Sequence, residues 1–122
     1  MKMVMVVDDS RIMRNIVKNT FTALKIPCEF IEATNGREAL QQLLSHKVDL
    51  VLLDWNMPEL SGLDFLKKVR AMDQYKNLPI IMVTSESAKY NVIEAIKSGA
   101  TNYIVKPVNE KKFIEKLSKI VF

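Results

Sequence analysis

The stretch VLLDWNMPELSG, residues 51–62, carries an apolar run directly into an acid, Asp54. A short run that is apolar at every position is typical of a strand buried on both faces of a sheet. Pro58 and Gly62 then favour a loop with fixed bends. The stretch therefore predicts a buried strand that delivers one carboxylate to the mouth of a loop.

Five short apolar runs recur along the chain, at 3–7, 29–33, 50–53, 80–83 and 102–105, and three of them are near-continuously apolar. Between them, apolar residues at spacings of three and four indicate helices with one apolar face. These residues are Ile12, Met13, Ile16, Val17, Phe21, Leu24, Ala39, Leu40, Leu43, Leu44, Leu63, Leu66, Val69, Val92, Ile93, Ile96, Phe113, Ile114, Leu117, Ile120 and Val121. The alternation favours a doubly wound α/β domain, with a parallel sheet between two helix layers.

Three residues mark expected helix ends. Ser10 and Asn109 stand where a side chain caps the first turn of a helix. Gly99 follows the fourth periodic segment, where a glycine is favoured because it adopts a left-handed backbone conformation without strain.

The composition is that of an ordinary globular domain. The 122 residues are 48% hydrophobic and 26% charged, with a net charge of +4 and one cysteine, which excludes an internal disulfide. The lysines recur beside glutamates on the expected helix faces, which favours a solvated surface over nucleic-acid binding. The apolar run at the start is too short for a signal peptide, and no run reaches membrane-spanning length. We expect a cytoplasmic protein that binds neither nucleic acid nor membrane.

Polar residues follow four of the five expected strands. Asp8 and Asp9 follow the first, Asp54 the third, Thr84 the fourth and Lys106 the fifth. Each of these residues alone would be an ordinary loop or cap residue. Sites in open parallel sheets form beyond the carboxyl ends of the strands, so we expect these side chains to share one site.

Three carboxylates at one edge repel each other and need relief from a proton, a lysine or a cation. Lys106 can offset one charge. Oxygen ligands without histidine or cysteine point to Mg²⁺ or a similar ion, which favours carboxylates together with a phosphate oxygen. Thr84 and Lys106 are then suitable donors to that phosphate.

These pieces together resemble the receiver domains of two-component response regulators. The matching segments are VVDDS (6–10), LLDWNMP (52–58), SG (61–62), VTSE (83–86), GA (99–100) and YIVKP (103–107). More narrowly, DWNMP and the Tyr103–Lys106 spacing are similar to the chemotaxis regulators of this family. The resemblance implies a flavodoxin-like (βα)5 fold with strand order 2-1-3-4-5. It also implies a single receiver domain over residues 1–122, without an output domain.

The resemblance implies a role for each residue of the expected site. Asp54 would accept a phosphoryl group from phosphohistidine on a sensor kinase. Asp9, Asp54 and the backbone carbonyl of Asn56 would bind Mg²⁺, and Asp8 would help mainly through water. Lys106 would pair with the phosphoryl oxygens, and its peptide bond to the next residue, a proline, would be cis.

Further residues of this pattern would transmit and time the signal. Thr84 would bond the phosphoryl group, and Tyr103 would swing inward when Thr84 moves. Asn56 and Glu86 would tune self-dephosphorylation, which implies a fairly short-lived phosphoryl state. The protein would not be an enzyme acting on a separate substrate, although it would catalyse its own phosphotransfer and slow self-dephosphorylation.

The resemblance implies a CheA-like sensor histidine kinase upstream and a flagellar motor switch protein as the output partner of a monomer. The partner face would comprise Lys89, Tyr90, Tyr103, Lys116 and Lys119. Ser85 stands where many members have alanine, and Val108 where phenylalanine is common.

Three alternatives stay open to different degrees. A phosphorelay intermediate or phosphate sink would pass the phosphoryl group to a histidine phosphotransfer protein, and the sequence separates it poorly from a motor regulator. A phosphohydrolase with an aspartyl intermediate would need a second acid where Asn56 stands. A flavin carrier would need a hydroxyl- and glycine-rich loop where Asp8 and Asp9 stand.

Overall fold

The computed structural model describes residues 1–85, 89–106 and 109–117, without the side chains at 84, 89, 90 and 110. Its strands are β1 (Lys2–Val7), β2 (Cys28–Ala33), β3 (Leu50–Leu53), β4 (Ile80–Thr84) and β5 (Asn102–Val105). Its α-helices are α1 (Arg11–Ala23), α2 (Gly36–Ser45), α3 (Gly62–Arg70), α4 (Lys89–Lys97) and α5 (Glu110–Leu117), and a short 3₁₀ helix, η1 (Asp73–Tyr75), follows α3.

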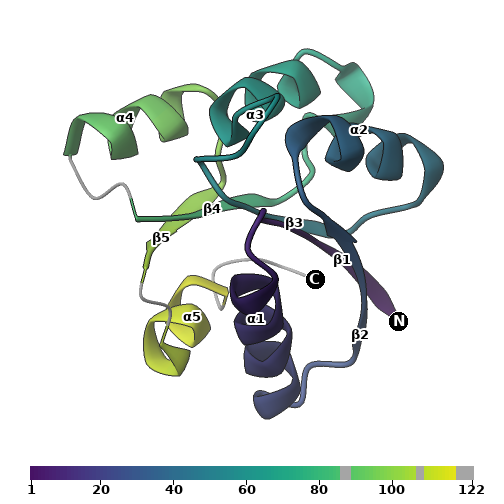
Figure 1. The fold of residues 1–122 in the computed structure, drawn as a ribbon, viewed down its shortest axis with the longest axis vertical. Coiled ribbons are helices and arrows are strands. Elements are labelled where there is room, and N and C mark those ends of the chain that lie inside the picture. Colours follow the sequence, from purple (N-terminus) through teal and green to yellow (C-terminus); the bar gives the residue numbers. More distant parts are fainter. Residues whose placement is uncertain (86–88, 107–108, 118–122) are drawn as a thin grey trace.

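All neighbouring strands pair in parallel, in the order β2-β1-β3-β4-β5. Helices α1 and α5 cover one face of the sheet, and α2, α3 and α4 cover the other (Figure 1). The expected doubly wound fold and its strand order are therefore confirmed.

The central strand β3 shows why its sequence is apolar at every position. Val51 and Leu53 belong to the core beneath α2, α3 and α4, whereas Leu50 and Leu52 belong to the core beneath α1 and α5. All of these side chains are buried. The edge strand β2 pairs only with β1 among the described strands, and its Glu29 and Glu32 are exposed.

The expected helix ends are confirmed where the structure describes them. The Ser10 hydroxyl accepts a hydrogen bond from the Met13 amide, and the Asn109 side chain accepts one from the Lys112 amide. Gly99 has a φ of 109°, and its amide donates to Ile96 while the next amide, of Ala100, donates to Ala95. These two bonds form a Schellman motif, which ends α4 at the start of the turn into β5.

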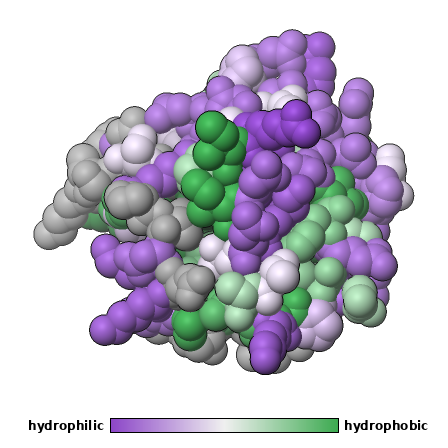
Figure 2. All heavy atoms as spheres, turned by 60° about the horizontal axis from the view of Figure 1, so that its bottom comes forward, coloured by the Kyte–Doolittle hydropathy of each residue, from purple (hydrophilic) through white to green (hydrophobic). Residues whose placement is uncertain are grey.

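The apolar periodicity predicts the helices correctly but overstates what they bury. Six of its residues within the described part of the chain are exposed: Ile12, Ile16, Leu44, Ile93, Ile96 and Ile114. A helix packed on a sheet buries only the stripe that faces the strands, which in α1 consists of Val17, Thr20 and Phe21. Figure 2 shows hydrophobic surface among hydrophilic side chains on the side that carries α1 and α5. Within the described ranges, no helix has the length and apolar character needed to cross a membrane.

Candidate functional site

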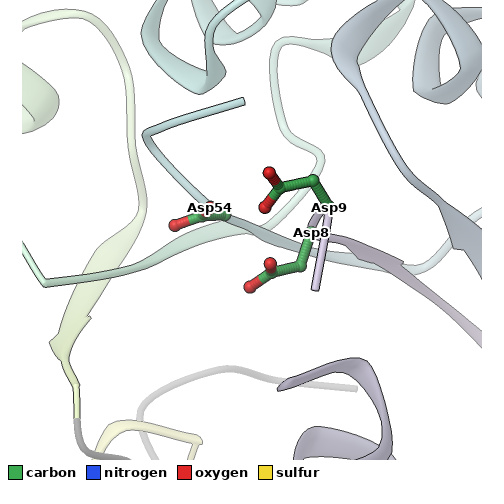
Figure 3. A group of neighbouring side chains, drawn as sticks. All are labelled: Asp8, Asp9 and Asp54. Atoms are coloured by element: carbon green, nitrogen blue, oxygen red, sulfur yellow. The ribbon is translucent and has the colours of Figure 1, made fainter. Parts of the chain in front are cut away.

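Three aspartates meet at the carboxyl ends of two adjacent strands. Asp8 and Asp9 follow β1, Asp54 follows β3, and the register pairs Val7 with Leu53 just before them. One carboxylate oxygen from each aspartate lies within 4.8 Å of the other two. Figure 3 shows the three carboxyl groups turned to the same side of the sheet end. Asp8 and Asp54 are buried and Asp9 is exposed, so the cluster is open to solvent on one side.

Lys106, which follows β5, joins this cluster. Its ammonium lies 3.2 Å from an oxygen of Asp8 and 3.3 Å from an oxygen of Asp54. The sequence led us to expect that it offsets one charge, and its single positive charge is shared between two carboxylates. Burial by itself would lower the pKa of Lys106, but the attraction of Asp54 and Asp8 outweighs burial and raises the pKa. The lysine is therefore firmly charged.

The Asp54 carboxyl group is harder to ionise than an ordinary aspartate in the absence of a metal ion. Its pKa rises from 3.8 to about 6, mainly because of burial and then because of the negative charges of Asp8 and Asp9, while Lys106 opposes the shift. Two carboxylates about 4 Å apart repel by roughly 4 kcal/mol at an effective dielectric constant of 20. Three acids with one lysine leave a deficit of positive charge, and a divalent cation would correct it.

The main chain holds Asp54 in place from both sides. Its amide donates to the carbonyl of Val7, which ties the end of β3 to the end of β1. Eight residues further on, the Gly62 amide donates to the carbonyl of Trp55 and folds the loop back onto the site. A Cβ on Gly62 would lie 1.9 Å from the Asp54 carbonyl oxygen, so this close approach requires glycine.

The loop between Asp54 and α3 contains a strained residue. Glu59 has a φ of 67°, and the amide of Leu60 donates to the carbonyl of Pro58 across it. A bond that spans a single residue with positive φ is a γ-turn, a conformation that is rare because it is strained. Asn56 in the same loop is exposed, and Trp55 is half-buried against the core.

The other predicted residues are described only in part. Thr84 ends β4, at the same sheet edge as the cluster, and Ser85 is exposed beyond it. Glu86, Pro107, Val108 and Lys119 lie outside the described residues, as do the side chains of Thr84, Lys89 and Tyr90. The roles predicted for them therefore remain predictions.

Part of the expected partner face does come together. Tyr103 of β5 and Lys116 of α5 line the same hollow of about 260 Å³, with Lys112 and Glu115. Lys89 and Tyr90 begin α4, which contacts β5.

The sequence interpretation overlooked Arg14. Its guanidinium donates to the carbonyl oxygen of Asp8 at 2.8 Å and to the carboxylate of Glu32 at 3.0 Å. Arg14 is one of two arginines in α1, and nothing in the sequence signals this contact, because the contact depends on how α1 lies against β1 and β2.

The fold and the acidic strand ends are those of a receiver domain, and the comparison with known families agrees. The family model for the response regulator receiver domain matches residues 4–118, and the chain belongs to this family.

Its relatives include chemotaxis regulators. It is 48% identical to a chemotaxis protein CheY homolog of Campylobacter jejuni, over 96% of this chain and 90% of that protein. It is 48% identical to chemotaxis protein CheY1 of Helicobacter pylori, over 96% of this chain and 94% of that protein. The solved structure of CheY4 of Vibrio cholerae matches with a TM-score of 0.89 at 36% identity and covers 99% of both chains.

Proposed function

We propose that this protein is a chemotaxis response regulator that accepts a phosphoryl group on Asp54 from a sensor histidine kinase. An oxygen of the Asp54 carboxylate attacks the phosphorus of phosphohistidine, the phosphorus–nitrogen bond breaks, and the imidazole leaves. The observation that carries this proposal is the arrangement of Asp54, buried at the end of β3 between two further aspartates and within 3.3 Å of Lys106. The protein then contributes position and charge, as phosphoryl transfer requires.

The donor set fits Mg²⁺, because the three clustered side chains offer only hard oxygen ligands. Asp9, Asp54 and the backbone carbonyl of Asn56 would hold the ion, with Asp8 beside them. When bound, Mg²⁺ would neutralise the acidic cluster and the charge of the incoming phosphoryl oxygens. Lys106, whose ammonium lies 3.3 Å from an oxygen of Asp54, would pair with a phosphoryl oxygen.

The output would be a change in affinity for a partner. Phosphorylation adds negative charge and acceptor oxygens at a place where Thr84 and Lys106 respond. Thr84 would draw Tyr103 inward and shift the population of the two states of the face with Lys89, Tyr90, Lys116 and Lys119. The relatives named as chemotaxis proteins support a CheA-like kinase upstream and a flagellar motor switch protein downstream, in the cytoplasm. We propose that the regulator works as a monomer and as a single receiver domain.

The phosphoryl group should be short-lived, since Asn56 and Glu86 are both polar at the positions that tune self-dephosphorylation in this family. Decay of the phosphorylated protein, followed by mass after removal of the phosphodonor, tests this. A phosphoryl group that persists over many hours would rule it out.

The fluorescence of Trp55, the only tryptophan in the sequence, tests metal binding and phosphorylation together. Mg²⁺ is titrated first and acetyl phosphate second, in the wild type, in Asp54→Asn and in Asp64→Asn, a control in which an exposed acid of α3 is changed. We expect a Mg²⁺-dependent response to acetyl phosphate in the wild type and the control but not in Asp54→Asn. No response in the wild type, together with no gain in mass, would overturn the proposed function.

A further inference from the structure

We propose that Arg14 is a positioning residue for the metal site, because it fixes the direction of the peptide bond between Asp8 and Asp9. This inference rests on the proposed function and deepens it. Arg14 touches no carboxylate of the cluster in the contacts described above, so it would act through the backbone rather than as a ligand.

The carboxylate of Asp9 depends on its backbone for its position. Asp9 is exposed, and among the described residues no hydrogen bond or ion pair holds its side chain. Asp8, by contrast, is held by the Ser10 amide at 2.9 Å and by Lys106 at 3.2 Å. Whatever orients the backbone between these two residues therefore decides where the oxygens of Asp9 point.

Arg14 supplies that orientation. Its Nη1 donates to the carbonyl oxygen of Asp8 at 2.8 Å, and this carbonyl belongs to the same planar peptide group as the amide of Asp9. The Asp8 amide, on the other side of the residue, donates to Ala33 on β2 at 3.0 Å. Asp8 is thus held at its amide by the edge strand and at its carbonyl by α1.

Glu32 holds the guanidinium in turn. One oxygen of Glu32 accepts from Nε of Arg14 at 3.0 Å, and the other accepts from Lys18, one turn along α1, at 3.1 Å. The Arg14 side chain is 12% exposed, so its position is well determined. Only the planar, forked guanidinium reaches both the carbonyl and the carboxylate.

Glu32 also offsets the positive charge of Arg14 near the proposed metal site. A cation placed directly behind a metal site would repel the metal, and a bound carboxylate cancels most of that charge. Burial by itself raises the pKa of Glu32, but hydrogen bonds and charge from Lys18 and Arg14 outweigh burial and lower it. Glu32 therefore stays ionised at neutral pH, and Arg14 orients the backbone with little net charge.

The test is the Mg²⁺ affinity of the folded protein, measured by Trp55 fluorescence without any phosphodonor. Arg14→Met removes the bond to Asp8, and Lys18→Met is the matched control, because it removes the other cation bound to the same glutamate but no contact with Asp8. Loss of a group that orients a metal ligand costs roughly 10-fold to 100-fold in affinity. We expect about a 10-fold weaker Mg²⁺ affinity for Arg14→Met and a change below about 2-fold for Lys18→Met.

Circular dichroism and urea unfolding of both variants show that the affinities refer to folded protein. Should Arg14→Met fail to fold, Arg14→Lys replaces it, since lysine keeps the positive charge but lacks the forked guanidinium that reaches both Asp8 and Glu32, and weaker Mg²⁺ binding than in Lys18→Met is expected. Wild-type affinity in a folded Arg14→Met protein, or equal weakening in Lys18→Met, would overturn the inference. Absence of Mg²⁺ binding in the wild type would instead overturn the proposed function, so the two failures are distinguishable.

Discussion

The Asp54 carboxyl group is buried, has two negatively charged neighbours and pairs with a lysine. These three influences determine how readily it ionises. Its pKa of about 6 belongs to the protein without metal. The same burial that makes the carboxylate costly to ionise also keeps water away from it and aims it at the open side of the cluster. A divalent cation or a phosphoryl group would therefore relieve an unfavourable state, which explains why the residue is suited to accept either.

The unfavourable negative charge of Asp54 predicts that the stability of the metal-free protein, measured with a metal chelator present, depends on pH. The pKa of Asp54 rises on folding from 3.8 to about 6, so the folded state holds the proton more tightly than the unfolded state. The contribution of this group to stability is therefore complete below pH 4 and is lost as the pH rises through 6. The loss amounts to about 3 kcal/mol at pH 7.

Urea unfolding of the wild type and of Asp54→Asn at several pH values measures this contribution. The variant should be the more stable protein at pH 7, and the difference should shrink towards pH 4. A constant difference over that range would contradict the assignment of the pKa shift to Asp54.

The close packing around Gly62 predicts that the addition of a single methyl group at this position destabilises the fold. Its Cβ would lie 1.9 Å from the carbonyl oxygen of Asp54, and the backbone there cannot move freely, because the adjacent bonds tie it to Trp55 and Val7. Gly62→Ala should cost about 3 kcal/mol or more in the free energy of unfolding. The neighbouring Ser61→Ala, which removes only the cap of α3, should cost about 1 kcal/mol. Equal losses in urea unfolding would contradict this account.

At the scale of the element, two helices end in the same motif with different residues. Gly99 ends α4 with a φ of 109°, and Lys25 ends α1 with a φ of 57°. In α1 the amides of Lys25 and Ile26 donate to Thr22 and Phe21, so the bonding matches that of α4. A residue with a side chain in the left-handed region destabilises the fold by about 1–2 kcal/mol. Lys25 at the end of α1 carries this strain, whereas Gly99 at the end of α4 does not.

Lys25→Gly should therefore stabilise the protein. Glycine relieves the strain of the left-handed conformation, and this gain exceeds the cost of the conformational entropy that glycine loses on folding. The free energy of unfolding should therefore rise by about 0.5–1 kcal/mol. Lys25→Ala is the control, since it removes the same side chain but keeps the Cβ. Thermal or urea unfolding that shows an equal gain for both variants would place the effect in the lysine side chain and not in the backbone.

The elements were predictable from the sequence because local chemistry decides them. The run at 50–53 is apolar throughout because β3 is buried on both faces, and Ser10, Asn109 and Gly99 mark helix ends through their own hydrogen bonds or backbone conformation. The proximity of Asp8, Asp9 and Asp54 followed from the rule that parallel strands deliver their ends to one edge. The Arg14 contact and the exposure of Ile12 could not be predicted, because both depend on the exact rotation of α1 against the sheet.

At the scale of the whole molecule, one sheet divides two hydrophobic cores. Beneath α1 and α5, Phe21 packs edge-on against Phe30 of β2 and Phe113 of α5, with ring centroids 5.7 Å and 5.3 Å apart. This cluster joins the edge strand to the last described helix. It holds the sheet, and therefore its strand ends, from the face opposite α3 and α4.

Two adjacent residues of α5 test this arrangement. Phe113 is fully buried and Ile114 is 46% exposed. Phe113→Ala should cost about 3–5 kcal/mol in the free energy of unfolding, because it opens a cavity against Phe21. Ile114→Ala should change it by less than about 0.5 kcal/mol, as surface substitutions do. Similar values for the two variants would contradict the observed rotation of α5.

The most direct test of the central claim is the site and metal dependence of phosphorylation. Wild-type protein is incubated with acetyl phosphate in Mg²⁺ or in EDTA, its intact mass is measured, and the modified peptide is sequenced by mass spectrometry. We predict one added phosphoryl group in Mg²⁺, located on Asp54, and almost none in EDTA. A phosphoryl group on another residue, or equal labelling with and without Mg²⁺, would contradict the account.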